Sequence, residues 1–295
     1  MSGPFELDDS EAYQRWRDAK LVRAITDIHQ LVVEIDDPTA LTAAEHAALR
    51  DRCQRSNMAI YATRRAMSEP DIKALGTQFG LQRLDANWLA DDLGITRITV
   101  CSKDGQRQAY IPYTNRPIKW HTDGYYNPPE RQIRAMVLHC AHDAAQGGEN
   151  RLLDHEIAYL LLREADPEHI CALSAPDAMT IPERTDEHGV ARPAQTGPVF
   201  SVDDAGHLHM RYTARTRSIE WKDDDATRAA VKALEHLLES DSPHIFRTRL
   251  SPGMGLLCNN VLHDRAAFTD APTAHQRLLY RARYLERITL PQTAR

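Results

Sequence analysis

From about residue 95 onward, the sequence is a succession of short β-favouring runs separated by turn residues. Segments such as KDG, DDAG and SPG mark the turns. The runs read ITRITVCS, RQAYIPYT, IRAMVLHC, NRLLD, GPVFSVD, HLHMRYT, IFRTRL, GMGLLCNN and RLLYRARYL. Many short strands of this kind predict a sandwich or a barrel, and the pattern alone does not choose between the two.

Helical patterns interrupt this β-rich part at residues 155–165 and 224–238. The first third is mixed, with helices expected over 10–24, 41–55 and 71–80 and strands over 29–36 and 58–63. Thr42 and Glu45 have the spacing of a capping box at the start of the second helix. Because no shift in composition marks a linker, we predict one domain over residues 1–295, mixed α/β over 1–95 and β-rich over 96–290.

The composition excludes several classes of protein. A net charge of -6 argues against nucleic acid or an anionic membrane as the main partner, and no apolar run approaches the ~18 residues of a membrane span. The first residues carry no secretory signal. Five scattered cysteines, none in CxxC spacing, fit a reducing compartment rather than a disulfide framework. We therefore expect a cytoplasmic protein whose partners are small molecules.

The segment WHTDGYYN carries a candidate metal-binding pair, His121 and Asp123. Residues two apart in an extended chain point to the same side, so both side chains can face one ion. His263 in NNVLHDRAAF follows the run GMGLLCNN and is therefore expected at a strand end. Two imidazoles and one carboxylate on one face of an octahedral ion leave three open positions, which suits iron(II).

Other readings of the same residues stay open. Chance produces many HxD pairs in a chain with 14 histidines, and His207 with His209 or His139 with His142 are competing pairs. Neither competing pair has a nearby carboxylate with basic residues downstream. A zinc-dependent hydrolase uses the same three ligand types, and a non-catalytic binding protein could retain them.

The run RLLYRARYL presents two faces in an extended strand. Arg277, Arg281 and Arg283 lie on one face, and Tyr280 and Tyr284 lie on the other. Arginines that face an interior need an anion, and a guanidinium matches a carboxylate in bidentate geometry. The alternative is that the arginines face solvent while the tyrosines pack inward.

Five motifs occur in order between about residues 111 and 284: WHTDGYY, the LHC of IRAMVLHC, GGEN, NNVLHDRAAF and RLLYR. About 140 residues separate the HxD pair from the distal histidine. This set resembles the taurine dioxygenase-like (TauD/TfdA) family of iron(II)- and 2-oxoglutarate-dependent dioxygenases, near its γ-butyrobetaine hydroxylase branch. The resemblance implies a mainly β fold with flanking helices, built on a double-stranded β-helix (jelly roll).

The resemblance also implies an activity. His121, Asp123 and His263 would bind Fe(II), and 2-oxoglutarate and O2 would be consumed while succinate and CO2 are released. The substrate would be a small polar, anionic or zwitterionic metabolite oxidised at a C–H bond, most simply by hydroxylation. Because Asp123 is present, oxygenation is favoured over halogenation. Dimers and tetramers are common in the family, so a homo-oligomer is a reasonable expectation.

The same resemblance assigns the co-substrate residues. Arg277 would pair with the distal carboxylate of 2-oxoglutarate, and Arg281 would lie near the carboxylate at the metal. Asn150, in GGEN, stands where the family usually has a hydroxyl, and its amide can donate a hydrogen bond instead.

Candidate substrate contacts are aromatic and basic residues near these motifs, with core packing and solvated surface as the alternative reading. They are Trp120, Tyr125, Tyr126, Arg211, Tyr212, Arg215, Asn260 and Arg265. Arginines would match an anionic or zwitterionic substrate, whereas tyrosines would match a quaternary amine.

Overall fold

The structure is a computed structural model that describes residues 3–85, 94–100, 111–186, 189–215, 219–271 and 276–288. Contacts within the chain group it into two compact units. The helical unit comprises Met1–Ala24, Lys119–Gln132 and Leu153–Ile245, and the sheet unit comprises Ile25–Ile118, Ile133–Leu152 and Phe246–Arg295. The single domain expected over residues 1–295 stays a prediction. No helix in the described ranges is long and apolar enough to cross a membrane.

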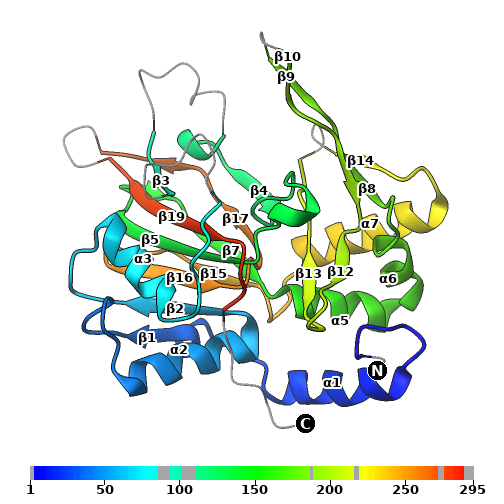
Figure 1. Ribbon diagram of the computed structural model, residues 1–295, viewed down its shortest axis with the longest axis horizontal. Coiled ribbons are helices and arrows are strands. Elements are labelled where there is room, and N and C mark those ends of the chain that lie inside the picture. Colours follow the sequence, from blue (N-terminus) through cyan, green and yellow to red (C-terminus); the bar gives the residue numbers. More distant parts are fainter. Residues whose placement is uncertain are drawn as a thin grey trace. The chain divides into compact units, whose positions relative to one another are not determined.

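A six-stranded sheet forms the centre of the sheet unit (Figure 1). Its strands, in spatial order, are β1 (Val32–Glu34), β2 (Met58–Ala62), β16 (Met254–Cys258), β5 (Ala135–His142), β19 (Leu278–Tyr284) and β3 (Ile95–Ile98). β1 and β2 run parallel, and the other neighbouring pairs are antiparallel. The strands come from distant parts of the sequence, so the sheet ties both ends of the unit together.

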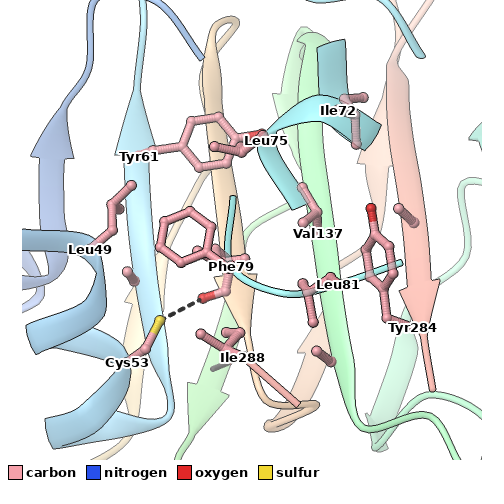
Figure 2. Close-up of a cluster of buried hydrophobic side chains, with 14 of the residues drawn as sticks. Leu49, Cys53, Tyr61, Ile72, Leu75, Phe79, Leu81, Val137, Tyr284 and Ile288 are labelled. Atoms are coloured by element: carbon pink, nitrogen blue, oxygen red, sulfur yellow. Dashed lines mark hydrogen bonds between the residues drawn. The ribbon is translucent and has the colours of Figure 1, made fainter. Parts of the chain in front are cut away.

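Both faces of this sheet are buried. Helices α2 (Ala43–Ser56) and α3 (Glu69–Thr77) cover one face, where Leu49 and Ile72 pack against Tyr61, Val137 and Tyr284 (Figure 2). The opposite face packs against β7 (Asn150–Leu153) and β15 (Phe246–Thr248) through side chains that alternate with the first set. Its core consists mainly of Met58, Ile60, Met136, Leu138, Leu152, Phe246, Leu256 and Leu279. Because side chains alternate along a strand, one strand such as β5 contributes to both cores.

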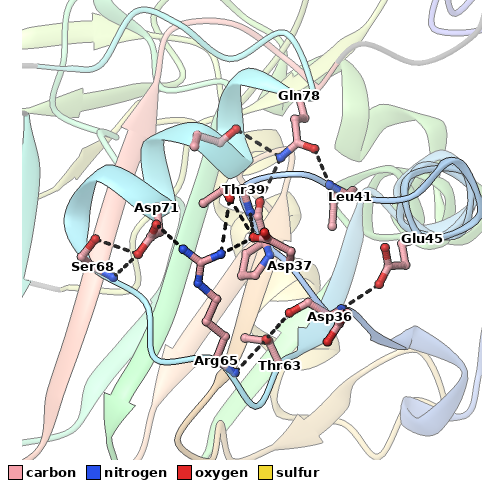
Figure 3. Close-up of polar contacts among 12 residues, drawn as sticks. Asp36, Asp37, Thr39, Leu41, Glu45, Thr63, Arg65, Ser68, Asp71 and Gln78 are labelled. Atoms are coloured by element: carbon pink, nitrogen blue, oxygen red, sulfur yellow. Dashed lines mark hydrogen bonds and ion pairs between the residues drawn. The ribbon is translucent and has the colours of Figure 1, made fainter.

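Polar contacts fasten the loop before α2 to α3 (Figure 3). Arg65 forms ion pairs with Asp37 and Asp71. The amide of Gln78 accepts a hydrogen bond from the Leu41 N–H at 2.8 Å and donates to backbone carbonyls on both sides. These contacts hold the two helices over their face of the sheet.

A smaller sheet has the strand order β15, β7, β17 (Leu262–Arg265) and β4 (Ile118–His121). Beside it, β18 (Phe268–Thr269) pairs with β6 (Gln146–Gly147). Gly147 has φ +72, and a Cβ on it would lie 2.2 Å from the Ala267 carbonyl oxygen. The first glycine of GGEN is therefore required by backbone contact between these segments.

The helical unit contains α1 (Ser10–Val22), α5 (His155–Ala165), α6 (Pro167–Leu173) and α7 (Asp225–Glu239). Asp154, Asp166 and Asp224 accept hydrogen bonds from first-turn amides and start the last three helices. Short antiparallel strands complete the unit. They are β8 (Met179–Ile181), β9 (Arg184–Asp186), β10 (Gly189–Arg192), β11 (Gln195–Gly197), β12 (Phe200–Val202), β13 (Leu208–Met210) and β14 (Glu220–Trp221).

Most predicted elements are confirmed. The five expected helices correspond to α1, α2, α3, α5 and α7, and the Thr42–Glu45 capping box is formed. The strand expected over 29–36 is wrong in its first half, because Asp27 caps a short 3-10 helix, η1 (Ile28–Leu31), before β1 begins. The strand expected at RQAYIPYT lies partly outside the described residues, and its end forms the 3-10 helix η2 (Ile111–Tyr113).

His139 is a buried histidine of β5 whose titration tests how stability depends on pH. It is 1% exposed, and its Nδ1 lies 3.1 Å from the Tyr61 hydroxyl. Burial lowers the pKa of His139 to about 4. The unfolded chain, with an ordinary histidine pKa, therefore binds the proton first as the pH falls.

We expect His139 to lower the free energy of unfolding by up to about 3 kcal/mol between pH 6.5 and pH 4. Urea unfolding at several pH values measures this loss. His139→Asn keeps a polar partner for Tyr61 but does not titrate, so its unfolding free energy should depend less on pH. Equal pH dependence in both proteins would contradict the assignment.

Candidate metal centre

His121 and Asp123 lie where β4 ends and the chain turns. Between them, the Thr122 N–H donates to the Tyr212 carbonyl at 3.0 Å, and the Tyr212 N–H donates to the Thr122 hydroxyl at 3.1 Å. His121 also forms an isolated β-bridge with Thr213. This neighbouring segment fixes the backbone of the HxD motif and holds His121 Nε2 3.9 Å from Asp123 Oδ1.

Backbone contacts set the orientation of both imidazoles. His121 Nδ1 lies 2.9 Å from the Lys119 carbonyl oxygen, and His263 Nδ1 lies 2.9 Å from the Val261 carbonyl oxygen. A carbonyl oxygen can only accept, so Nδ1 carries the proton in each contact and leaves the Nε2 lone pair for a ligand. Histidines that bind metals are typically oriented in this way.

His263 lies within β17 rather than at the end of the preceding strand. Asn260, with φ +52, forms the turn between β16 and β17, and its side-chain N–H donates to the Ile133 carbonyl at 2.6 Å. β17 neighbours β4 in the smaller sheet.

One donor atom each from His121, Asp123 and His263 can be chosen so that all three lie within 4.8 Å of one another. In the described ranges, no other group of three or more His, Cys, Asp and Glu side chains could hold a metal ion. Of the competing histidines, His139 faces Tyr61 and His207 faces Asp203 on the surface. The donor set is oxygen and nitrogen without sulfur, which fits iron(II).

Asp264, next to His263, fastens β17 to β7. Its carboxylate accepts the Arg151 backbone N–H at 2.8 Å and the Arg151 side-chain Nε–H at 2.7 Å. Asn150 donates its side-chain amide to the Asp264 carbonyl at 2.6 Å. Asn150 thus supports the strand that carries His263, and its contact with a co-substrate stays a prediction.

Arg277 is a buried cation, only 6% exposed. Its guanidinium lies 4.9 Å from the Phe268 ring centre, and a Cβ on Gly148 would come within 3.4 Å of its Nε. Within the described part of the chain, the guanidinium has no hydrogen bond or ion pair, and only its backbone N–H is bonded, to Asp270. Burial lowers the pKa of Arg277.

The residues of β19, which follows Arg277, agree in part with both readings of the RLLYRARYL run: buried arginines, or inward-packed tyrosines with solvated arginines. Tyr280 and Tyr284 pack in the core beneath α2 and α3. This is the inward packing of the tyrosines that the second reading predicted. The arginines are not solvated, however. Arg283 is 3% exposed and pairs with Asp85 at 2.6 Å, and Arg281 is half-buried.

Three residues expected to contact the substrate donate side-chain hydrogen bonds to backbone carbonyls. Arg211 donates to four carbonyls, including those of Met179 at 2.6 Å and Gly197 at 3.0 Å. Arg265 donates to the carbonyls of residues 112, 114 and 116. With the Asn260 amide also bonded to backbone, all three hold the fold together, and we leave them out of the proposed substrate site.

The aromatic candidates divide into buried and accessible residues. Trp120 and Tyr212 are 2% and 1% exposed and belong to the core of the helical unit. Tyr125 is buried, whereas Tyr126 and Arg215 are partly exposed. Two further cations, Arg192 beside Tyr126 and Arg249 near Arg277, lie in no motif of the sequence.

Known proteins share this fold. Asparagine oxygenase, solved with Fe(II), hydroxyasparagine and succinate, has 14% identity and a TM-score of 0.56, covering 84% of this chain and 85% of that chain. The non-haem iron oxygenase OrfP, solved with Fe and alpha-ketoglutaric acid, has 15% identity and a TM-score of 0.61, covering 83% and 80%. PvcB from Pseudomonas aeruginosa has 14% identity and a TM-score of 0.58, covering 86% and 84%. The jelly-roll prediction is confirmed.

Proteins with similar sequences are also oxygenases. A uridine-5'-phosphate dioxygenase from an Amycolatopsis species is 34% identical over 172 residues, which are 57% of this chain and 60% of that protein. The profile of the family described as taurine catabolism dioxygenase TauD, TfdA matches residues 21–283. The predicted position near the γ-butyrobetaine hydroxylase branch stays a prediction. Because the match spans most of its length, the chain belongs to the TauD/TfdA dioxygenase family.

Proposed function

We propose that this protein is an Fe(II)- and 2-oxoglutarate-dependent oxygenase whose iron ligands are His121, Asp123 and His263. The observation that carries the proposal is the convergence of their donor atoms to within 4.8 Å. The orientation of both imidazoles by backbone carbonyls adds support, since each presents Nε2 as the ligand atom. Bound iron(II), with 2-oxoglutarate and O2, would supply the oxidising chemistry, and the protein orients the reactants.

Arg277 is the residue that we propose for the distal carboxylate of 2-oxoglutarate. A buried charge without a partner is unfavourable, and an incoming carboxylate would satisfy the guanidinium with two charge-assisted hydrogen bonds. Gly148 leaves room beside the arginine, and the Phe268 ring supports its position. Arg281 near the metal-proximal carboxylate remains the family-based assignment.

The proposed substrate is a small polar metabolite with an anionic or zwitterionic group, oxidised at a C–H bond. The relatives support this class, because one is named for uridine 5′-phosphate and the structures contain hydroxylated amino acids. Uridine 5′-phosphate is therefore the first compound to test. A cytoplasmic location and a homo-oligomeric state stay predictions.

Anaerobic titration tests the metal and co-substrate together. Adding iron(II) and 2-oxoglutarate to the metal-free protein should produce the weak visible charge-transfer band of the chelate. His121→Ala should abolish the band and turnover, while circular dichroism shows that the fold remains. A zinc hydrolase would not form succinate from 2-oxoglutarate, and a non-catalytic binding protein that kept the ligands could show the band but would form no succinate.

A pair of substitutions, one just before β19 and one within it, tests the role of Arg277 through stability. Arg277→Met should stabilise the ligand-free protein by about 1–3 kcal/mol, because it removes a desolvated cation, and should weaken 2-oxoglutarate binding. Arg283→Met is the matched control, since it strands Asp85 and should destabilise by about 3–5 kcal/mol. Urea unfolding measures both changes. Destabilisation by Arg277→Met, with undiminished 2-oxoglutarate affinity, would show that the arginine is structural.

A further inference from the structure

Two arginines lie directly opposite each other on the β9–β10 hairpin. Arg184 and Arg192 are Cα partners in the antiparallel register, and a bulge between Val190 and Arg192 produces this pairing. Side chains of opposite residues lie on the same face of a hairpin, where like charges are destabilising. Burial lowers the pKa of Arg192, and the charge of Arg184 acts in the same direction.

The Arg192 guanidinium is held in place but is not satisfied. Its Nη2 donates to the Pro182 carbonyl at 2.6 Å. Its Nη1 is buried and has no hydrogen-bond partner among the residues that the structure describes. An unmade hydrogen bond of a buried polar group is unfavourable, and more so for a charged group. The hairpin therefore carries two cations on one face and, on Arg192, a buried donor that an anion would satisfy.

This guanidinium also lies beside Tyr126, which follows the HxD motif in the sequence. Its Cζ is 5.8 Å from the centre of the Tyr126 ring, and the Tyr125 and Tyr126 rings meet edge to face at 5.2 Å. Both tyrosines occupy the middle of a turn that the Asn127 N–H closes by donating to the Gly124 carbonyl at 2.8 Å. Tyr126 is three residues from Asp123, so their Cα atoms are at most about 11 Å apart.

We propose that Arg192, assisted by Arg184, binds a phosphate monoester group of the substrate that is oxidised. This inference rests on the proposed function, because Asp123 is taken as an iron ligand. A phosphate monoester carries close to two negative charges at neutral pH, which matches two guanidiniums better than the single charge of a carboxylate. Tyr126 would border the adjoining part of the substrate.

Binding measurements with four probes test the proposal. The probes are uridine 5′-phosphate, uridine, inorganic phosphate and L-asparagine, titrated by calorimetry into the metal-free protein and into the anaerobic iron(II)–2-oxoglutarate complex. Arg192→Gln should weaken binding of uridine 5′-phosphate by about 10- to 100-fold and leave binding of uridine unchanged. Arg184→Gln should cause a smaller loss in the same direction.

Arg15→Gln is the charge-matched control in the same unit, because Arg15 is exposed and only pairs with Glu11 on the surface of α1. It should change none of the affinities. Thermal unfolding of Arg192→Gln shows whether the hairpin substitution disturbs the fold.

Three results would overturn the proposal: no binding of either phosphate probe to the wild-type protein, equal weakening of uridine and uridine 5′-phosphate, or Arg192-dependent binding of L-asparagine alone. Failure of the proposed function looks different. In that case the chelate band is missing from the wild-type protein, while phosphate binding to the metal-free protein is still measured. Retention of the band in Arg192→Gln would show that the hairpin acts on the substrate and not on the co-substrate.

Discussion

The guanidinium of Arg277 is buried and forms no hydrogen bond or ion pair among the described residues, which is unfavourable for a charge and makes this residue the central constraint on the site. Arg277 directly precedes β19, and this strand cannot shift to relieve the unfavourable burial. Tyr280 and Tyr284 fill the core beneath α2 and α3, and Arg283 is locked to Asp85. A slip by one residue would exchange the two faces and disrupt all of these contacts. Within the described residues, the sheet thus fixes the position of a buried cation that forms no ion pair, as the proposed binding of an anion by Arg277 requires.

Elements with local signals were predictable from sequence. The Thr42–Glu45 capping box and the apolar periodicity of α5 and α7 depend on residues close in the chain, and each helix is present. The same is true of the HxD motif, since its two side chains are neighbours. The distal histidine needed the resemblance to a family, because no local pattern pairs His263 with residues about 140 positions earlier.

The roles of the arginines could not be predicted from local sequence signals. Arg211 and Arg265 were candidates for anion binding in sequence, but the Nη groups of both donate to backbone carbonyls of other segments. Asn150 also donates to the Asp264 carbonyl, and its expected contact with the co-substrate stays a prediction. Arg192 was not predicted as a site residue, because only a bulge in the β9–β10 register places it opposite Arg184. Tertiary pairing, rather than residue type, decides which cation remains available.

The residues proposed for the metal and co-substrate and those proposed for the substrate lie on different kinds of elements. Structures that share the fold at 14–15% identity were solved with different molecules, hydroxyasparagine in one and hydroxy-L-arginine in another, so the fold alone does not select the substrate. In this chain, the residues proposed for the metal and 2-oxoglutarate lie on β4, β17 and β19 or just beyond them. Those proposed for the substrate lie on a turn and a hairpin, which are the elements that vary most readily.

X-ray absorption at the iron edge of the anaerobic iron(II) protein tests the central claim most directly. The account predicts a six-coordinate ion with two imidazole ligands, oxygen ligands for the rest and no sulfur, and a loss of one imidazole in His263→Ala. Two imidazoles that persist in His263→Ala, or a sulfur ligand in the wild-type protein, would contradict the assignment of the site.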